Sequence, residues 1–236
     1  MRSTFVKICG ITRPDDAQQA LALGAGAIGL NFVAGPRKIS AVDAAEILAA
    51  ISAGSSVVAL LHIPDSSAVA GLETILDSPL VTHLQLYGDY SRFCQSGPVA
   101  AAMAKGKRFK LWPVFRIGSP ADVRAIPRRV AECGFRPDGL VLDTFSIGLQ
   151  GGSGQAFDWN WLEAAAAEGQ LTGLPPIILA GGLNADNVGH AIDLVQPWGV
   201  DVASGVENTG QSGIKNSDMM DRFIQAVYIA DEERRS

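Results

Sequence analysis

The feature that most constrains the fold of this chain is a repeated alternation of short apolar segments with helix-forming segments. Each apolar segment is four to seven residues long and ends near a glycine or a polar residue, as strands of a buried parallel sheet do. The expected strands lie at residues 5–9, 27–32, 56–62, 81–87, 109–115, 140–143, 176–180 and 199–203. Eight strand–helix units in 236 residues favour a single (β/α)₈ barrel over a doubly wound sheet.

No linker, low-complexity segment or sequence repeat divides these units, so we expect residues 1–236 to form one barrel domain. A net charge of −5 and a pI near 5.2 argue against a nucleic-acid partner. No run of 18 apolar residues is present, and the first residues lack a signal-peptide core, so no membrane partner is expected. The cysteines Cys9, Cys94 and Cys133 have no metal-ligand spacing, which favours a reducing cytoplasm and no metal.

Strand parity predicts which side chains enter the barrel. In the first strand Lys7 and Cys9 share one face, and in the eighth Asp201 points away from the face of its two valine neighbours. The residues expected on one side of the fourth strand are Val81, His83, Gln85 and Tyr87. A polar inward face near the end of a strand is typical of a binding site rather than of a core.

A proline and an asparagine predict an irregularity in one strand and the start of one helix. Pro113 cannot donate to a strand ladder, so we expect a bulge or an early end of the fifth strand near it. Asn184 is a suitable N-cap for a helix that runs through Val195.

Glycine-bearing loops follow the last three strands. Asp143 ends the sixth strand and is followed by a loop that contains Gly151-Gly152-Ser153-Gly154. Glycines allow backbone N–H groups to approach an anion closely, and the loops after the seventh and eighth strands of such barrels commonly bind phosphate. We therefore expect a phosphate site at Gly154, Gly182, Ser204 and Gly205.

Motifs along nearly the whole chain match one family. They are Lys7-Ile8-Cys9-Gly10-Ile11-Thr12, Gly35-Pro36-Arg37, Gln85-Leu86, Leu142-Asp143-Thr144, Gly151-Gly152-Ser153-Gly154 with Phe157-Asp158-Trp159, Gly181-Gly182-Leu183 with Asn187-Val188, and Val200-Asp201-Val202 with Ser204-Gly205-Val206-Glu207. In these segments the chain resembles the phosphoribosylanthranilate isomerases of tryptophan biosynthesis. The start motif combined with Asp143 and the Ser-Gly-Val-Glu segment is the specific part of the resemblance.

The resemblance implies a TIM barrel of the ribulose-phosphate-binding type that catalyses an Amadori rearrangement of a small phosphorylated substrate without metal or cofactor. By the family pattern Asp143 is the acid that opens the ribose ring, and Cys9 is the base that removes the C2 proton. A thiolate base needs cationic help, for which Lys7 is a possible source. The resemblance further implies that Arg37 binds the anthranilate carboxylate and that Asp201 contacts the substrate or supports residues that do.

The sequence departs from the family at two positions. Tyr87 stands where the family usually has His, and Pro113 stands near a usual Lys. We expect Gln85 and Tyr87 to line the substrate site and Tyr87 to be a tolerated packing substitution. Two alternatives stay open: a paralogue acting on another phosphorylated sugar or aldosylamine, and a non-catalytic phosphate-ligand-binding barrel. Both a monomer and a homodimer are compatible with the sequence.

Overall fold

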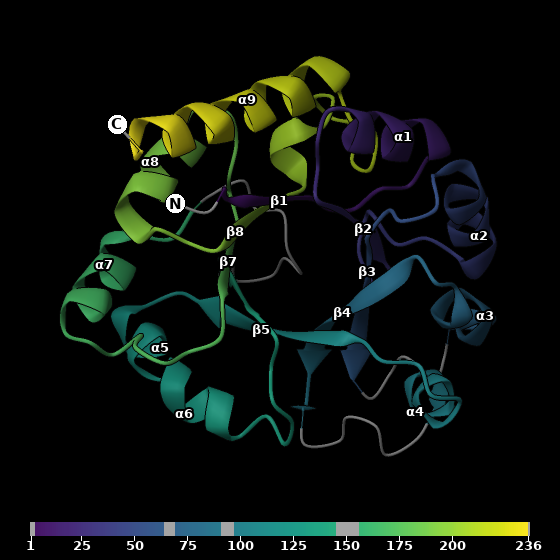
Figure 1. The fold of residues 1–236 in the computed structure, drawn as a ribbon, viewed down its shortest axis with the longest axis horizontal. Helices are drawn as coiled ribbons and strands as arrows, with labels where there is room; N and C mark the ends of the chain where they lie inside the picture. Colours follow the sequence, from purple (N-terminus) through teal and green to yellow (C-terminus); the bar gives the residue numbers. More distant parts are fainter. Residues whose placement is uncertain (1–2, 64–68, 91–96, 145–155, 236) are drawn as a thin grey trace.

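Eight parallel strands close into a barrel with the order β1 to β8, which confirms the predicted (β/α)₈ architecture. The computed structural model describes residues 3–63, 69–90, 97–144 and 156–235. The strands are β1 (Phe5–Ile8), β2 (Ala27–Asn31), β3 (Val57–Ile63), β4 (Val81–Gly88), β5 (Lys110–Ile117), β6 (Leu140–Thr144), β7 (Ile177–Ala180) and β8 (Gly199–Val202). Figure 1 shows the helices arranged around the outside of this ring.

Helices connect the strands in the expected alternation. They are α1 (Pro14–Ala22), α2 (Ala41–Ala50), α3 (Leu72–Asp77), α4 (Gly97–Ala104), α5 (Pro120–Arg124), α6 (Ile126–Ala131), α7 (Asn160–Ala167), α8 (Val188–Val195), the 3₁₀ helix η3 (Ser204–Val206) and α9 (Ser217–Glu233). Ser40 caps α2 as predicted, with a reciprocal capping box to Asp43. One helix was expected over residues 120–133, but two are present because Pro127 at the start of α6 cannot donate to the preceding turn.

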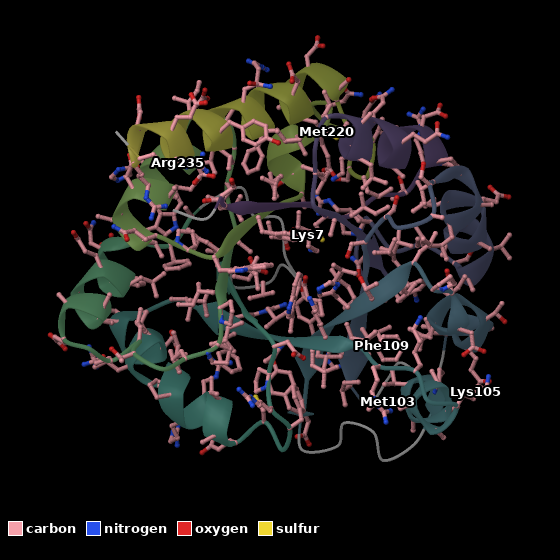
Figure 2. The ribbon with its side chains drawn as sticks, viewed as in Figure 1. Lys7, Met103, Lys105, Phe109, Met220 and Arg235 are labelled. Atoms are coloured by element: carbon pink, nitrogen blue, oxygen red, sulfur yellow. The ribbon has the colours of Figure 1, made fainter. Side chains whose placement is uncertain are left out.

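The two faces of the strands bury different clusters. The outward face packs against the helices in the main apolar core, whereas Cys9, Trp112 and their neighbours fill the inside of the barrel. At the end where the strands begin, the Phe5 ring stacks on Trp198 with centroids 4.7 Å apart, and the Trp112 and His83 rings lie 4.4 Å apart. These packed rings occupy that end of the barrel, and the two cavities considered below lie at the other end. In Figure 2 Lys7 lies within the ring of strands.

The face predicted for Val81 is wrong. Val57 pairs with Val81, but the next residue, Val58, pairs with His83, so Thr82 is an extra residue on β4. A bulge of this kind reverses the alternation of side chains on one side of it. Val81 therefore belongs to the outer core, while His83, Gln85 and Tyr87 keep the predicted inward face.

We had expected a bulge or an early end of the fifth strand near Pro113, but β5 does not end there. It continues to Ile117. Pro113 is the last partner of β4, opposite Leu86, and from Val114 onward β5 pairs with β6. The proline thus lies where the pairing passes from one neighbour to the other, which is where the missing N–H costs least.

The start of α8 also differs from the expectation for Asn184. The helix begins at Val188, and Asn187 occupies its N-cap position. The side chain of Asn184 instead accepts a hydrogen bond from the Asp186 N–H at 2.9 Å, forming a local turn ahead of the helix.

The first strand and the last helix are joined by a buried polar contact. The backbone N–H and the hydroxyl of Thr4 donate to the two carboxylate oxygens of Asp231 at 2.6 and 2.7 Å. Figure 1 shows α9 running along the outside of β1 and β8. Within the described part of the chain, no helix is long and apolar enough to cross a membrane.

We predict that Asp231→Ala lowers the free energy of unfolding by about 1–3 kcal/mol, because it leaves buried Thr4 donors without a partner. Urea unfolding followed by circular dichroism measures this loss. The control is Glu232→Ala on the exposed side of the same turn, which should change stability by no more than about 0.5 kcal/mol. Equal losses in the two variants would show that the contact to Thr4 adds nothing.

Candidate active site

A cavity of about 90 Å³ opens at the end of the barrel where the strands finish. Eight of the residues singled out from the sequence line it: Cys9, Arg37, Gln85, Tyr87, Asp143, Gly182, Asp201 and Ser204. Of the other two, Gly205 follows Ser204 in η3, and Gly154 lies outside the described residues. The structure therefore brings residues from β1, β4, β6, β7 and β8 to one place.

The floor of the cavity contains a buried ion pair between Lys7 and Asp201. The Lys7 Nζ donates to Asp201 Oδ2 at 2.7 Å, and both side chains are buried. Burial alone would lower the pKa of Lys7, but the Asp201 carboxylate and the Cys9 sulfur outweigh it and raise that pKa. The second oxygen of Asp201, Oδ1, is buried without a hydrogen-bond partner among the described residues. It is available to a ligand.

Cys9 lies directly above this ion pair. Burial raises the pKa of its thiol, and the Asp201 carboxylate raises it further. Lys7 and Lys215 act in the opposite direction but do not reverse the shift. The cationic help expected from Lys7 is thus present, although Asp201 offsets much of it. In the ligand-free protein the thiol form dominates near neutral pH.

Asp143 is a buried carboxyl group at the end of β6. Burial, together with the negative charge of Asp201, raises its pKa to about 6, while Arg116 opposes the shift. A carboxyl group with this pKa keeps part of its proton near neutral pH. Asp143 can therefore donate a proton, whereas an exposed aspartate would be fully ionised.

Arg37 is held in place by a residue to which sequence analysis assigned no role. Its Nε and Nη2 atoms both donate to the Glu207 carboxylate at 2.7 Å, forming a bidentate pair. Lys215 donates to the same carboxylate at 2.9 Å and to the Ala203 carbonyl at 3.0 Å. Gly10, with φ of +68°, allows the Arg37 side chain to pass closely over it. Nη1 is not used in this pair, and within the described part of the chain it is free to meet a ligand.

The signal for Glu207 was present in the sequence as part of the Ser-Gly-Val-Glu segment, but nothing there indicated its partner. Arg37 is 170 residues away along the chain. The shared Arg37 and Lys215 contacts lower the pKa of Glu207 despite its burial, so it stays ionised. Lys215 was missed because an isolated lysine in a loop is ordinarily solvated.

Gln85 and Tyr87 form one wall. The Gln85 Nε2 donates to the Tyr87 hydroxyl at 3.0 Å, and Gln85 Oε1 is buried without a partner among the described residues. Burial, with the nearby Asp143 and Cys9 charges, raises the pKa of Tyr87 well above its usual range, so the phenol stays neutral. Its predicted orientation into the barrel mouth is confirmed.

The loops after β7 and β8 pack closely against each other and against β6. A Cβ added at Gly205 would meet the Leu183 carbonyl oxygen, and Gly181 and Gly182 both have positive φ. A Cβ at Gly181 would lie 2.8 Å from Asp143 Oδ1 and closer still to Thr144. These glycines therefore set the distance between the Asp143 carboxyl group and the two loops. Among the described residues no cluster of three or more His, Cys, Asp or Glu could hold a metal ion.

Comparisons with known proteins agree on one family. Residues 6–226 match the model described as N-(5'-phosphoribosyl)anthranilate (PRA) isomerase. A relative of that name from Bordetella petrii is 38% identical over 235 residues, covering 98% of each chain. The solved structure of monomers generated from the dimeric isomerase of Thermotoga maritima is similar with a TM-score of 0.70 and 26% identity, covering 95% of this chain and 98% of that one. A complex of a phosphoribosylanthranilate isomerase with reduced 1-(o-carboxyphenylamino)-1-deoxyribulose 5-phosphate has a TM-score of 0.68 and 25% identity, with the same coverage.

We predict that Gly181→Ala destabilises the protein by clearly more than Gly54→Ala. Both glycines have positive φ, so both substitutions incur the backbone strain of about 1–2 kcal/mol. At Gly54 nothing lies within 4 Å of the added methyl group, whereas at Gly181 it collides with Thr144 and Asp143. Urea midpoints of the two variants measure the difference. Equal midpoints would mean that the loop yields freely at Gly181.

Proposed function

The chain belongs to the N-(5'-phosphoribosyl)anthranilate isomerase family, and from that membership and the site geometry we propose a catalytic role for each residue of the cavity. The protein is an isomerase of tryptophan biosynthesis that converts N-(5-phosphoribosyl)anthranilate into 1-(2-carboxyphenylamino)-1-deoxyribulose 5-phosphate by an Amadori rearrangement. The observation that carries the assignment is the presence of Cys9 and Asp143 in one cavity at the barrel mouth.

Asp143 is the general acid of the first step. Its proton passes to the ring oxygen of the ribose, the bond between that oxygen and C1 breaks, and the anthranilate nitrogen forms a protonated Schiff base with C1. The raised pKa of Asp143, about 6, supports this role because a catalytic acid works best with a pKa near the working pH. Asp201 contributes indirectly, since its charge favours the protonated form of Asp143.

Cys9 is the general base of the second step. Its thiolate removes the proton from C2, and the electrons of that bond move toward the Schiff-base nitrogen to give an enolamine. The enolamine then becomes the ketone of the product by proton transfer. Lys7 and Lys215 favour the thiolate, and the cationic Schiff base adds a positive charge next to it once the substrate has opened.

Arg37 and the glycine loops hold the two ends of the substrate. With Nε and Nη2 bound to Glu207, Arg37 directs its Nη1 donors at the anthranilate carboxylate. Gly182, Ser204 and Gly205 hold the phosphate, together with Gly154 on the basis of sequence. The neutral Tyr87 ring packs against the aromatic ring, and Gln85 Oε1 accepts a hydrogen bond from the substrate.

Two further observations bear on location and assembly. Among the described residues Cys9 and Cys133 are free and buried, which supports a cytoplasmic location. The Thermotoga maritima relative is described as dimeric, and for this chain we propose a monomer or a homodimer.

We predict that Asp143→Asn and Cys9→Ser each lower kcat by about 10²-fold or more while the fold is retained, because each removes one proton-transfer group. The assay is the loss of substrate fluorescence when N-(5-phosphoribosyl)anthranilate is supplied, with circular dichroism as the control for folding. Near-normal kcat in either variant would remove that residue from the mechanism. Absence of turnover by the unmodified enzyme would favour another phosphorylated aldosylamine as substrate.

The pH dependence of kcat/KM provides a separate test. The acid must be protonated and the base ionised, so kcat/KM should rise about tenfold per pH unit up to the Asp143 pKa of about 6. Between this value and the higher pKa of Cys9, the loss of protonated Asp143 and the gain of thiolate cancel, and the profile should be flat. Measurement from about pH 4.5 to about pH 9 tests this. A fall that starts near the Asp143 pKa would show that the ionisation of Cys9 does not limit the rate.

A further inference from the structure

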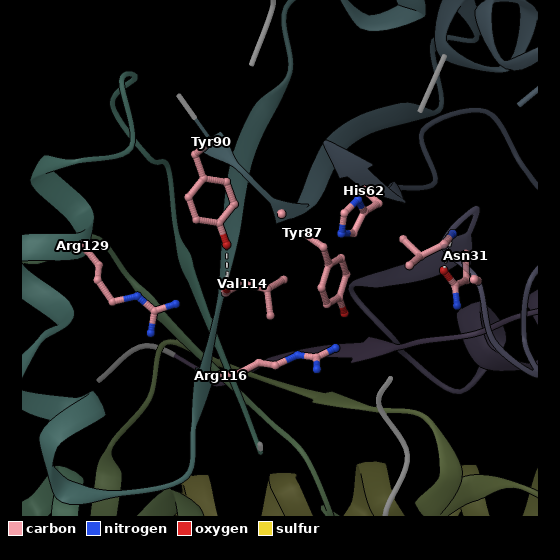
Figure 3. A pocket seen from close by; sticks show the side chains of 10 residues that line it. Asn31, His62, Tyr87, Tyr90, Val114, Arg116 and Arg129 are labelled. Atoms are coloured by element: carbon pink, nitrogen blue, oxygen red, sulfur yellow. Dashed lines mark hydrogen bonds between the residues drawn. The ribbon is translucent and has the colours of Figure 1, made fainter. Parts of the chain in front are cut away.

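A second and larger cavity lies beside the catalytic cavity. Its volume is about 310 Å³, and residues near the ends of β2, β3, β4 and β5 line it. Figure 3 shows this space with the side chains around it. Asn31 and Tyr87 line both cavities, so the two spaces meet at these side chains. The proposed mechanism uses the catalytic cavity and leaves the second one unexplained.

The second cavity is suited to an anion. None of its ten described lining residues is Asp or Glu, whereas Arg116 and Arg129 both contribute. The Arg129 guanidinium lies 4.3 Å from the centre of the Phe115 ring and is engaged there in a cation–π contact. The Arg116 guanidinium makes no hydrogen bond or ion pair with a described side chain, although its charge acts on Asp143, its partner in the ladder between β5 and β6. Figure 3 shows it reaching from β5 toward Tyr87.

Two tyrosine rings form part of the remaining walls, beside small apolar residues and the polar side chains of Asn31 and His62. The Tyr90 hydroxyl donates to the Val114 carbonyl, which holds that ring against β5. Tyr87 presents its ring and receives a hydrogen bond from Gln85. A cavity with two tyrosine rings and a guanidinium that has no hydrogen-bond partner among the described side chains fits an aromatic group that carries a carboxylate.

Arg37 and Arg116 lie on different sides of the site. Arg37 lies over Gly10 beside the ends of β1 and β8, whereas Arg116 follows Phe115 on β5. In the binding mode proposed above, Arg37 binds the carboxylate next to the substrate nitrogen and the Tyr87 ring packs against the anthranilate ring. Beyond Tyr87 the second cavity begins.

We propose that the second cavity is a subsite for a further carboxylate on the aromatic ring, with Arg116 as its partner. This rests on the function proposed above. The enzyme therefore also isomerises N-(5-phosphoribosyl) derivatives of aminobenzenedicarboxylates. The bonds made and broken are those of the principal reaction, so no additional reactant is required.

The test compares substrates made by condensing ribose 5-phosphate with anthranilate, 2-aminoterephthalate or 4-aminoisophthalate. The last two carry their second carboxylate at different ring positions. We expect the unmodified enzyme to turn over at least one of the two dicarboxylate substrates with kcat/KM within about tenfold of the anthranilate value. Turnover of the anthranilate substrate alone would overturn the proposal.

The variant Arg116→Met tests whether Arg116 is the partner of the second carboxylate. We expect the kcat/KM of the accepted dicarboxylate substrate, divided by that of the anthranilate substrate, to fall about 10- to 100-fold, the loss of one charge-assisted pair. The ratio is used because Arg116 also influences the pKa of Asp143, an effect common to both substrates. Arg128→Met removes an exposed guanidinium that does not line the cavity, so it is the matched control and should leave the ratio within about threefold. An unchanged ratio in Arg116→Met would overturn the assignment.

Direct binding separates this proposal from the isomerase assignment. By calorimetry, free 2-aminoterephthalate or 4-aminoisophthalate should bind more tightly than anthranilate to the unmodified enzyme, and Arg116→Met should abolish the difference. If the anthranilate substrate is not turned over but this difference is found, the subsite stands and the reaction must be reassigned. If turnover is found but neither dicarboxylate binds more tightly, the isomerase stands and the subsite is wrong.

Discussion

The buried ion pair between Lys7 and Asp201 is the interaction on which the rest of this structure depends. The two residues are direct partners in the ladder between β1 and β8, which closes the barrel. Removing one member of such a pair leaves an uncompensated buried charge, at a cost of about 3–5 kcal/mol. Burial is the main cause of the raised pKa values of Cys9 and Asp143, and the charges of this ion pair add to or oppose it. One contact thus contributes both to closing the barrel and to the pKa values of the groups in the cavity.

Burial and charge act differently on Asp143 and Cys9 in their proposed roles as acid and base. Both groups are held toward their protonated forms, which suits Asp143 as a donor but not Cys9 as a base. The protein supplies Lys7 and Lys215 to favour the thiolate, yet Asp201 opposes them. In our account the positive charge that develops on the opened substrate completes the activation of Cys9. The base becomes effective only after the acid has acted, so the order of the two steps follows from electrostatics.

The arginines Arg37 and Arg116, which line the two cavities of the barrel mouth, differ in how they are held. Arg37 is fixed by Glu207, which is itself held by Lys215. In its proposed role Arg37 can therefore bind a carboxylate at one position only. Arg116 has no such partner among the described residues and faces a larger space. A fixed guanidinium provides specificity for the common carboxylate, whereas an uncommitted one tolerates additional groups. In our proposals the barrel mouth is therefore specific for one carboxylate beside Arg37 and accepts additional groups beside Arg116.

The sequence by itself determined features that depend only on residues close together in the chain. The strand count, the inward direction of Lys7, Cys9 and Asp201, and the placement of Asp143 follow from a two-residue period and from chain order, which need no knowledge of partners. Only the tertiary structure decided the rest: the bulge that turns Val81 outward, the continuation of β5 past Pro113, the pairing of Arg37 with Glu207, and the second cavity. Each of these depends on which residues of distant segments come to lie opposite one another. Register and side-chain pairing across the barrel are set by packing of the whole chain, and no local pattern encodes them.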